Sequence, residues 1–495
     1  MIYVHSLGRA AQYFPQRAAL AANGTRSTFR ELHDRVGRIA TALTKHGFKA
    51  GDRLAILLPN EPDYIELVYA CAWLGVTALP LNTRLSVKEI DGILDDAKPG
   101  GLIRHSSLPV PTVQVSWQAV LDQDPLDIQS DSIPDPIYDP HAILALIYTS
   151  GTTGRPKGVE IRHANILENV YHTNFWFPLE EGAMHLHAAP IFHIADFPFM
   201  FAAPAFGACQ VTIPKFNPQT FCETIQRERV THTVLVPTMI NMLTQSPEQK
   251  YDLSTLRHLG YGGSPMAPEL VHRTRQVLPK VKLVQVYGLS EAGFLTGLLD
   301  HEHTEDKLTS CGRPCLGIDV RVVDPTGKEV ETGKTGELVA RGANIMRSYS
   351  NKPEETKLAF RNSFFRTGDI GYQDGSGYLY ILDRLKDMIV TGGENVYSGE
   401  VEAVIYTHPA VGEVAVFGIP DPKWGELVMA DVVLKPGKTL SADELIAYCR
   451  RSLANYKIPR RVEFSDTELP KSGSGKILKK VLRERFWTHQ ESAVS

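Results

Sequence analysis

The chain has 495 residues, of which 43% are hydrophobic and 22% charged, and its formal net charge is -4. These values are ordinary for a globular protein and argue against disorder, collagen or a coiled coil for the whole chain. A net charge this small gives no indication of binding to nucleic acid or to a membrane surface. The six scattered cysteines exclude a disulfide scaffold and favour buried thiols in a reducing, cytoplasmic compartment.

The first hundred residues contain amphipathic segments that alternate with short apolar runs. Apolar side chains at helical spacing indicate helices, and short apolar runs bounded by glycine or proline indicate buried strands. Strands that alternate with helices are typical of an α/β fold with a largely parallel sheet. The predicted elements are helices that begin at the capping-box pairs Thr28–Glu31 and Ser86–Glu89, a helix over residues 64–74, and strands over residues 53–60 and 77–82.

Two further segments stand out by composition. Residues 122–140 are rich in Asp and Pro, which favour turns, so a surface connection is expected there. The apolar segment 197–209 contains two prolines and is shorter than the span of about 20 residues that a bilayer requires. We therefore expect it to form the buried wall of a core or pocket. The N-terminus has no basic segment followed by an apolar core, so no secretion signal is expected.

A loop rich in glycine and hydroxyl groups follows the apolar run at residues 142–150. The segment TSGTTGRPKG, from Thr149 to Gly158, combines three glycines with Ser and Thr hydroxyls and with Lys157. Glycines let backbone N–H groups approach phosphate oxygens, hydroxyls donate further hydrogen bonds, and the lysine adds positive charge. Neither this segment nor GSGKI at residues 473–477 has the pattern of a Walker loop, so a P-loop NTPase is disfavoured.

The sequence pattern changes near residue 383. A charged stretch there passes through an apolar run into a double glycine (DRLKDMIVTGG). Short strands and capped helices follow to the end of the chain, and one helix is expected to begin at the capping-box pair Ser441–Glu444. The length of this last part suits a small, independent α+β domain. We therefore predict one domain over residues 1–383, a second domain over residues 384–495, and a hinge at residues 383–387.

Six motifs resemble, in order and spacing, those of the adenylate-forming superfamily, which comprises acyl-CoA synthetases, carrier-protein adenylation domains and luciferases. The resemblance covers essentially the whole chain. It implies an α/β fold with a large N-terminal adenylate-forming domain that has parallel-rich sheets, and a small, mobile C-terminal α+β domain. The stretch from Asp383 to Glu402 looks closest to bacterial fatty-acyl-CoA and aryl-CoA ligases. The motifs are YTSGTTGRPKG (148–158), YGGSP (261–265), YGLSE (287–291), FFRTGD (364–369), DRLKDMIVTGGENV (383–396) and PKSGSGKI (470–477).

The resemblance implies a two-step reaction that uses ATP, Mg²⁺ and coenzyme A. A carboxylate attacks the α-phosphate of ATP to give an acyl-adenylate and pyrophosphate, and the thiol of CoA then displaces AMP. Because a carboxylate is a weak nucleophile, the enzyme must position it and stabilise charge on the phosphate. The implied partners are therefore a small carboxylic acid, ATP and CoA, with no nucleic acid and no transmembrane segment, and a homodimer is compatible with the resemblance.

Most of the motif residues are implied to bind the nucleotide. Glu291 would be the ligand of Mg²⁺, and Ser290, at a position where Thr is usual, would contact the α-phosphate. Tyr287 would stack on adenine, Asp369 would accept hydrogen bonds from the ribose, and Arg384 would contact the ribose or the phosphate. The implied set is Thr149, Ser150, Gly151, Thr152, Thr153, Gly154, Lys157, Gly262, Gly263, Tyr287, Gly288, Ser290, Asp369 and Arg384.

Catalysis is assigned by the same resemblance. Lys476, a flexible ammonium group on a glycine-rich loop, would bridge the acyl carboxylate and the α-phosphate during adenylation. Lys386 would be the hinge at which the small domain rotates and exchanges the Lys476 loop for the loop at residues 391–398. His193, which follows an aromatic residue, would orient the substrate or close the site. The residues implied for the CoA half-reaction are Gly392, Gly393 and Glu394.

The acyl pocket is expected to be lined by His193 and the segment after it, by Tyr261 and by Val286. This set is apolar and aromatic and contains no Arg for a second carboxylate, so a dicarboxylic acid is disfavoured. The Val286 side chain, where many related ligases carry Gly, would narrow or shorten the pocket. Asp196 is unusual in an apolar segment and is expected to face solvent or to bind a polar substituent. A fatty acid and an aryl or cinnamoyl-type acid both stay open.

The sequence argues against three alternatives to this function. A zinc site formed by His185, His187 and His193 is disfavoured because no cysteine or second pair completes a tetrahedral set. An acyl-AMP ligase that loads a carrier protein often has an insertion that hinders domain rotation, and none is recognisable here. A noncatalytic nucleotide-sensing module would tolerate loss of Lys476 or Glu291, yet both are present.

Overall fold

The computed structural model describes residues 1–123, 126, 133–149, 156–245, 250–471 and 477–487. It divides into two compact units: Met1–Val320 with Ala340–Phe365, and Arg321–Val339 with Arg366–Ser495. Within the described ranges, no helix combines the length and the apolar character that crossing a membrane requires. All six cysteines are buried thiols, as their number and scatter predicted.

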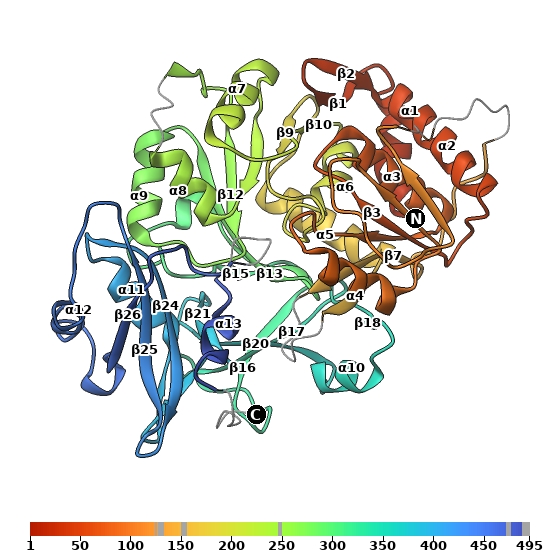
Figure 1. The fold of residues 1–495 in the computed structure, drawn as a ribbon. Helices are drawn as coiled ribbons and strands as arrows, with labels where there is room; N and C mark the ends of the chain where they lie inside the picture. The colour runs from red at the N-terminus through yellow and green to blue at the C-terminus, as the bar shows by residue number, and fades with distance from the viewer. Residues whose placement is uncertain (124–125, 127–132, 150–155, 246–249, 472–476, 488–495) are drawn as a thin grey trace. The chain divides into compact units, whose positions relative to one another are not determined.

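The first unit contains a nine-stranded sheet (Figure 1). Its central strands, from β13 to β1 in sheet order, are parallel, and antiparallel strands close both edges. The parallel strands end at one edge, which is where ligands bind in open α/β sheets. In sheet order the strands are β15 (Arg313–Pro314), β14 (Gly293–Leu298), β13 (Lys282–Leu289), β12 (His258–Gly262), β11 (His232–Leu235), β9 (Met184–His187), β10 (Cys209–Thr212), β1 (Ala18–Ala22) and β2 (Thr25–Thr28).

The same unit contains a seven-stranded sheet. The strands from β7 to β6 in sheet order are parallel, and β8 and β18 extend the sheet beyond β7 with antiparallel pairing. The predicted phosphate loop connects β7 to β8. In sheet order the strands are β18 (Ser348–Tyr349), β8 (Lys157–Arg162), β7 (Ile143–Thr149), β4 (Thr77–Pro80), β3 (Arg53–Leu57), β5 (Gly101–Arg104) and β6 (Trp117–Val120).

Helices cover the faces of both sheets. α7, α8 and α9 pack on one face of the nine-stranded sheet and share its apolar core, and Figure 1 shows α8 and α9 beside β12. α3 contacts β4 of one sheet and β1 of the other, and α5 contacts β8 and β14, so these helices lie between the sheets. The helices are α1 (Arg9–Tyr13), α2 (Phe29–Lys45), α3 (Pro62–Leu74), α4 (Val87–Ala97), α5 (His163–Trp176), α6 (Phe199–Ala205), α7 (Pro218–Glu228), α8 (Pro237–Gln245), α9 (Pro268–Val277) and α10 (Pro353–Ala359).

Local sequence signals account for the helix starts in this unit. The predicted capping boxes are confirmed: Thr28 and Glu31 cap α2 reciprocally, and Ser86 and Glu89 cap α4. The strands predicted over residues 53–60 and 77–82 correspond to β3 and β4, and the helix predicted over residues 64–74 corresponds to α3. The apolar segment 197–209 contains α6, whose side chains are mostly buried, so the prediction of a buried wall is also confirmed.

The second unit contains two smaller sheets. In one, β17 lies between β16 and β20, and β21 pairs with β20; the other has the order β23–β22–β25–β24 with β26 paired to β25. α11 and α12 share an apolar core with the latter sheet, and the predicted capping box of Ser441 and Glu444 begins α12. The elements are β16 (Asp319–Val323), β17 (Gly336–Arg341), β20 (Phe364–Gln373), β21 (Leu379–Arg384), β22 (Ile389–Thr391), β23 (Glu394–Val396), α11 (Ser398–Tyr406), β24 (Val411–Asp421), β25 (Gly425–Leu434), α12 (Ala442–Cys449), β26 (Arg461–Phe464) and α13 (Lys479–Glu484).

Candidate active site

Lys157 and Glu291, the predicted phosphate and magnesium residues, both contact Tyr349. The Nζ atom of Lys157 lies 5.1 Å from the centre of the Tyr349 ring, a cation–π distance. The Tyr349 hydroxyl donates a hydrogen bond of 2.8 Å to Oε1 of Glu291. Strand β18, which carries Tyr349, pairs with β8, which begins at Lys157. The sheet pairing therefore brings an ammonium group and a carboxylate to the same tyrosine.

The strands on either side of the predicted phosphate loop end together. Thr149, the last residue of β7, is paired with Lys157, the first residue of β8. Both side chains are half-buried. The loop residues Ser150, Gly151, Thr152, Thr153 and Gly154 lie outside the described residues. The described strand ends thus present one hydroxyl and one ammonium group side by side, the two kinds of donor that a phosphate site uses.

The oxygen donors near Glu291 match the preferences of Mg²⁺. Glu291 is half-buried, and its backbone carbonyl accepts a hydrogen bond of 2.6 Å from the N–H of Met346. Together with the hydrogen bond from Tyr349, this contact fixes both ends of the residue. Mg²⁺ is usually held by one or two carboxylates and by phosphate oxygens of the substrate. The residues present therefore fit this ion.

Two of the predicted nucleotide-site glycines are required by the packing of the strands themselves. A Cβ atom on Gly262 would lie 2.2 Å from the carbonyl oxygen of Val286, and one on Gly288 would lie 1.9 Å from that of Gly293. Any side chain at either position would force the neighbouring strands apart. The glycines therefore set the spacing of β12, β13 and β14 where these strands form the edge of the site.

The other predicted nucleotide residues of this unit lie at the same edge. Gly263 follows β12 with a φ of +80°, a conformation that glycine adopts without strain. Tyr287 is half-buried next to an irregularity in the pairing of β13 with β14, and Ser290 is half-buried in the turn between these strands. The carboxyl ends of β12 and β13 thus bring together a flat aromatic ring, a hydroxyl group and the half-buried backbone of Gly263 and Gly288.

Tyr261 and Val286, both predicted to line the acyl pocket, point to opposite faces of the nine-stranded sheet. Val286 is paired with Gly262, and neighbouring residues of a strand point to opposite faces. Tyr261 is fully buried in the core beneath α7, α8 and α9. Its hydroxyl lies 2.9 Å from Nε2 of His303. This position speaks against a role for Tyr261 in a pocket that Val286 lines.

Aromatic rings lie directly against the sheet face that carries Val286. A Cβ atom on Gly260 would lie 2.1 Å from the ring of Phe177, and one on Gly297 would lie 2.4 Å from the ring of Trp176. Gly297 is paired with Val286, and Gly260 lies two residues before Gly262 on β12. A phenyl ring therefore lies over Gly260 and an indole ring over Gly297, and neither of these two positions has room for a side chain.

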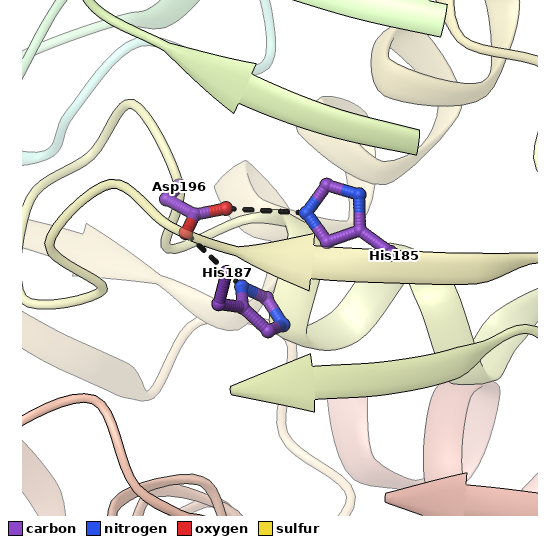
Figure 2. Close-up of side chains that lie close together, drawn as sticks. All are labelled: His185, His187 and Asp196. Atoms are coloured by element: carbon purple, nitrogen blue, oxygen red, sulfur yellow. Dashed lines mark hydrogen bonds and ion pairs between the residues drawn. The ribbon is translucent and has the colours of Figure 1, made fainter. Parts of the chain in front are cut away.

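Asp196 is completely buried, so the expectation that it faces solvent is wrong. Figure 2 shows its carboxylate between two histidines of β9: Oδ1 lies 3.3 Å from Nε2 of His185, and Oδ2 lies 3.1 Å from Nδ1 of His187. The imidazoles supply the polar contacts that a carboxylate needs inside a protein. The predicted active-site His193 does not belong to this cluster; it lies three residues before Asp196 and is half-buried.

In the second unit, the predicted ribose residue Asp369 is paired with Arg384. The two residues are opposite each other on β20 and β21, and Oδ1 of Asp369 lies 2.8 Å from Nε of Arg384. Asp369 is buried, and the guanidinium group is partly exposed. The ion pair holds the carboxylate in one orientation. An acceptor for two ribose hydroxyl groups needs this fixed orientation.

The remaining predicted residues of the second unit lie in turns. Lys386 is exposed, and its carbonyl accepts a hydrogen bond of 3.1 Å from Arg483 of α13. Of the three residues predicted for the CoA half-reaction, Gly392 and Gly393 form the tight turn between β22 and β23, where both have positive φ, and Glu394 begins β23. Lys476 lies outside the described residues. The domain boundary at 383/384, the hinge and the roles of these residues stay predictions.

Sequence reasoning missed Tyr349 and the partners of Asp196. Tyr349 lies 58 residues from Glu291 in the chain, and no motif marks it. The contact arises from the pairing of β18 with β8, which spacing does not encode. His185 and His187 were considered only as zinc ligands. Their alternation on one strand was a usable signal, since residues two apart share a sheet face.

Comparisons with known proteins identify the family of the chain. The family model described as AMP-binding enzyme matches residues 7–350, and that of the AMP-binding enzyme C-terminal domain matches residues 400–476. A feruloyl-CoA synthase of Amycolatopsis is 40% identical over 97% of this chain and 98% of its own. A long-chain-fatty-acid–CoA ligase of Mycobacterium tuberculosis is 36% identical over 93% of both chains. The solved structure of O-succinylbenzoate coenzyme A synthetase from Bacillus subtilis, in complex with ATP and magnesium ion, matches with a TM-score of 0.86 and 33% identity over 97% of this chain and 98% of that one.

Proposed function

The chain belongs to the AMP-binding enzyme family and is an AMP-forming acid–CoA ligase, and we propose that its acid substrate is a compact aryl or cinnamoyl-type monocarboxylic acid. The observation that carries this proposal is the aromatic covering of the sheet around Val286. Trp176 and Phe177 lie against glycines of β14 and β12 at contact distance. Flat rings packed in this way favour a flat, aromatic substrate over a long flexible chain.

The charge of the candidate pocket supports a monocarboxylic acid. Residues 193–201 and 284–288, which the structure describes throughout, contain no Arg or Lys. A second carboxylate would enter this apolar region without a cation to pair with, at a large cost in desolvation. Similarity to a feruloyl-CoA synthase at 40% identity supports the same class of acid.

We propose that adenylation takes place where Thr149, Lys157 and Glu291 lie. One carboxylate oxygen of the acid forms a bond to the α-phosphorus of ATP, and the bond from that phosphorus to pyrophosphate breaks. Lys157 would bind the β- and γ-phosphates together with the loop that follows Thr149, and Lys476 would stabilise the charge that develops at the α-phosphate. When bound at Glu291, Mg²⁺ would supply further positive charge to the phosphates.

In the second step the sulfur of CoA bonds to the acyl carbon, the bond from that carbon to the AMP oxygen breaks, and the thiol proton passes to solvent. His193 would orient the acid for both steps. Its Nδ1 atom lies 3.3 Å from the N–H of Ala195, which places the proton of a neutral ring on Nε2. Gly392, Gly393 and Glu394 would serve this half-reaction, after rotation at Lys386.

The remaining nucleotide contacts follow from the same family. Tyr287 would stack on adenine, Asp369 would accept hydrogen bonds from the ribose, and Arg384, which holds Asp369, would contact the ribose or a phosphate. We further infer a cytoplasmic location, because ATP and CoA are available there and the buried thiols suit a reducing compartment. Homodimerisation stays a prediction, which light scattering of the purified protein tests directly.

A panel of carboxylic acids tests the proposed substrate class. Purified protein is given MgATP, CoA and one acid at a time: 4-hydroxycinnamic, ferulic, benzoic, hexanoic, hexadecanoic or malonic acid. AMP is measured with and without CoA, and the thioester is identified by mass. We expect kcat/KM for the cinnamoyl-type acids to exceed that for hexadecanoic acid by about tenfold or more. A preference for hexadecanoic acid would contradict the aryl class, and transfer only to a phosphopantetheinylated carrier protein would contradict CoA as the acceptor.

A further inference from the structure

Asp196 connects two segments of the first unit that surround His193. Its side chain contacts His185 and His187 on β9, as Figure 2 shows. Its backbone belongs to the turn that begins at His193, since the N–H groups of both Asp196 and Phe197 donate to the His193 carbonyl at 3.0 Å. One buried residue therefore holds this turn against the sheet.

The protons in the cluster can be placed from the hydrogen bonds. Burial lowers the pKa of His185 to about 4, so its ring is neutral near pH 7. Its Nδ1 atom has no hydrogen-bond partner among the described residues, so the single proton lies on Nε2 and is donated to Asp196. Burial opposes ionisation of Asp196, but the neighbouring imidazoles hold the pKa of this carboxyl below its usual value.

Gln210 completes the network on the neighbouring strand β10. Nε2 of His187 lies 3.1 Å from the side-chain amide of Gln210. On its other side, Nδ1 of His187 donates to the Asp196 carboxylate at 3.1 Å, because an ionised carboxylate can only accept. Each ring nitrogen next to Asp196 therefore carries a proton.

Further contacts hold the segment on the other side of His193. The side chain of Asn60 donates to the carbonyl of Ala189 at 2.7 Å and accepts from the N–H of Ile191 at 3.0 Å. The ring of His185 stacks on Phe199 at the start of α6, with centroids 4.4 Å apart and an interplanar angle of 4°. His193 therefore lies between two anchored points of the chain, and Asp196 is the only carboxylate of this buried cluster of described residues.

We infer that Asp196 is a positioning residue for the acid substrate. It holds the turn at residues 193–197, and with it the wall of the acyl pocket, in a fixed position against β9. The inference rests on the proposed function, because it assigns His193 to the acid site. The same three side chains, His185, His187 and Asp196, are of the types that ligate metal ions, and their ligand atoms lie within 4.8 Å of one another. The protonated nitrogens favour the hydrogen-bonded cluster instead, since a histidine must present a bare nitrogen to a metal.

The test compares three variants of the full-length enzyme. Asp196→Ala removes both hydrogen bonds that hold the turn. Asp196→Asn keeps the shape, and His185 can accept from the amide by moving its own proton to Nδ1. Thr233→Val is the matched control, because it removes a buried hydrogen bond of 2.9 Å to the carbonyl of Leu186 on β9, on the other face of the sheet. KM for acid, KM for ATP, kcat and thermal stability are measured for each variant. The metal content of the wild-type enzyme is measured separately.

We expect Asp196→Ala to lower kcat/KM for the acid by roughly 10- to 100-fold, as expected when a reacting group is misplaced by about 1 Å. KM for ATP should change less than threefold, and Asp196→Asn should recover most of the loss. Thr233→Val should lower stability and leave both KM values unchanged. If Asp196→Ala is insoluble, Asp196→Glu takes its place, because the carboxylate remains while the added methylene displaces the turn.

Three results would overturn the inference. The first is an Asp196→Ala or Asp196→Glu enzyme in which the KM values for acid and ATP rise together, as a general loss of structure would cause. The second is an unchanged kcat/KM for the acid. The third is one equivalent of a tightly bound transition metal in the wild type. A wild-type enzyme that forms no thioester with any acid of the panel would instead contradict the proposed function.

Discussion

The ammonium group of Lys479 lies 2.8 Å from Oε1 of Glu402 and 2.6 Å from the hydroxyl of Ser398. Lys479 begins α13, directly after the segment that carries Lys476, and both partners belong to α11. The backbone N–H of Ser398 in turn donates to Asp383, at the start of the predicted hinge. The base of the Lys476 loop and the hinge are therefore fixed to the same helix.

Lys479→Met should destabilise the protein, because it leaves the carboxylate of Glu402 without its cation. The two side chains are 16% and 18% exposed, so we expect a loss below that of a fully buried pair, about 1–3 kcal/mol in the free energy of unfolding. The control is Lys480→Met. Lys480 is 50% exposed and lies 3.8 Å from Glu484, so its loss should cost at most about 0.5 kcal/mol. Equal effects of the two variants in urea unfolding would contradict the structural role of Lys479.

Acid should destabilise the protein through buried histidines. Burial lowers the pKa of His163 and His232 to about 3 and that of His185 to about 4, whereas an unfolded histidine titrates near about 6.5. Below that pH the unfolded chain takes up protons that the folded chain does not, so stability is present at neutral pH and falls as the pH is lowered. Each histidine should contribute about 1 kcal/mol per pH unit between about pH 6 and pH 5.

His163→Asn checks this assignment. The Nδ1 atom of His163 accepts a hydrogen bond of 3.3 Å from the N–H of Ile2, which an amide oxygen can accept as well. The variant should therefore fold, and it should reduce the slope of unfolding free energy against pH by about one histidine's share. A slope identical to that of the wild type would show that His163 does not couple protonation to folding.

Much of the fold could be predicted because its signals are local. The capping boxes at Thr28, Ser86 and Ser441 depend on residues three apart, and each was confirmed. The motif residues Thr149 and Lys157 could be placed by the glycine-rich segment between them. The contact of Tyr349 with Glu291 depends instead on which strands pair, and Asp196 became interpretable only when its turn was seen against β9. Pairing between distant segments leaves no periodic trace in the sequence.

Tyr349→Phe should weaken the use of MgATP. The phenyl ring keeps its contact with Lys157, but Glu291 loses the hydroxyl group that orients it. The loss of one hydrogen bond to a charged group predicts a reduction of about 10-fold in kcat/KM for ATP and a higher requirement for Mg²⁺. Pyrophosphate release at varied Mg²⁺ measures both. Tyr138→Phe is the control, since its hydroxyl contacts His5 at an exposed position; an equal effect there would contradict the role of Tyr349.

Val286→Gly should shift the acid preference toward longer or bulkier acids. Val286 is 6% exposed on the face that Trp176 and Phe177 cover, so removing its side chain opens space only at that point. Each methylene that a pocket accepts or refuses changes binding by about 1–3 kcal/mol, which predicts a shift of about tenfold in relative kcat/KM. Val284→Ala, two residues earlier on the same face, should lower stability without changing the order of acids. An unchanged preference in Val286→Gly would exclude this side chain from the pocket.

Lys476→Ala should separate the two half-reactions. Its loop lies outside the described residues, but Lys479, three residues later, is tied to α11, so truncating Lys476 leaves the anchor of the loop intact. The loss of a preorganised donor at the α-phosphate predicts a reduction of about 10²–10³ in the rate of acyl-adenylate formation. Thioester formation from supplied acyl-adenylate should change far less, because rotation at Lys386 would by then have exchanged the Lys476 loop for the loop at residues 391–398. Lys476→Arg should not restore adenylation, since a planar guanidinium group does not replace a compact ammonium.

The control is Lys480→Ala. Lys480 is an exposed lysine of the same basic run, so its loss should leave both rates unchanged. The measurement is the ratio of the two half-reaction rates in each variant, and a ratio equal to that of the wild type in Lys476→Ala would show that another residue stabilises the adenylation step.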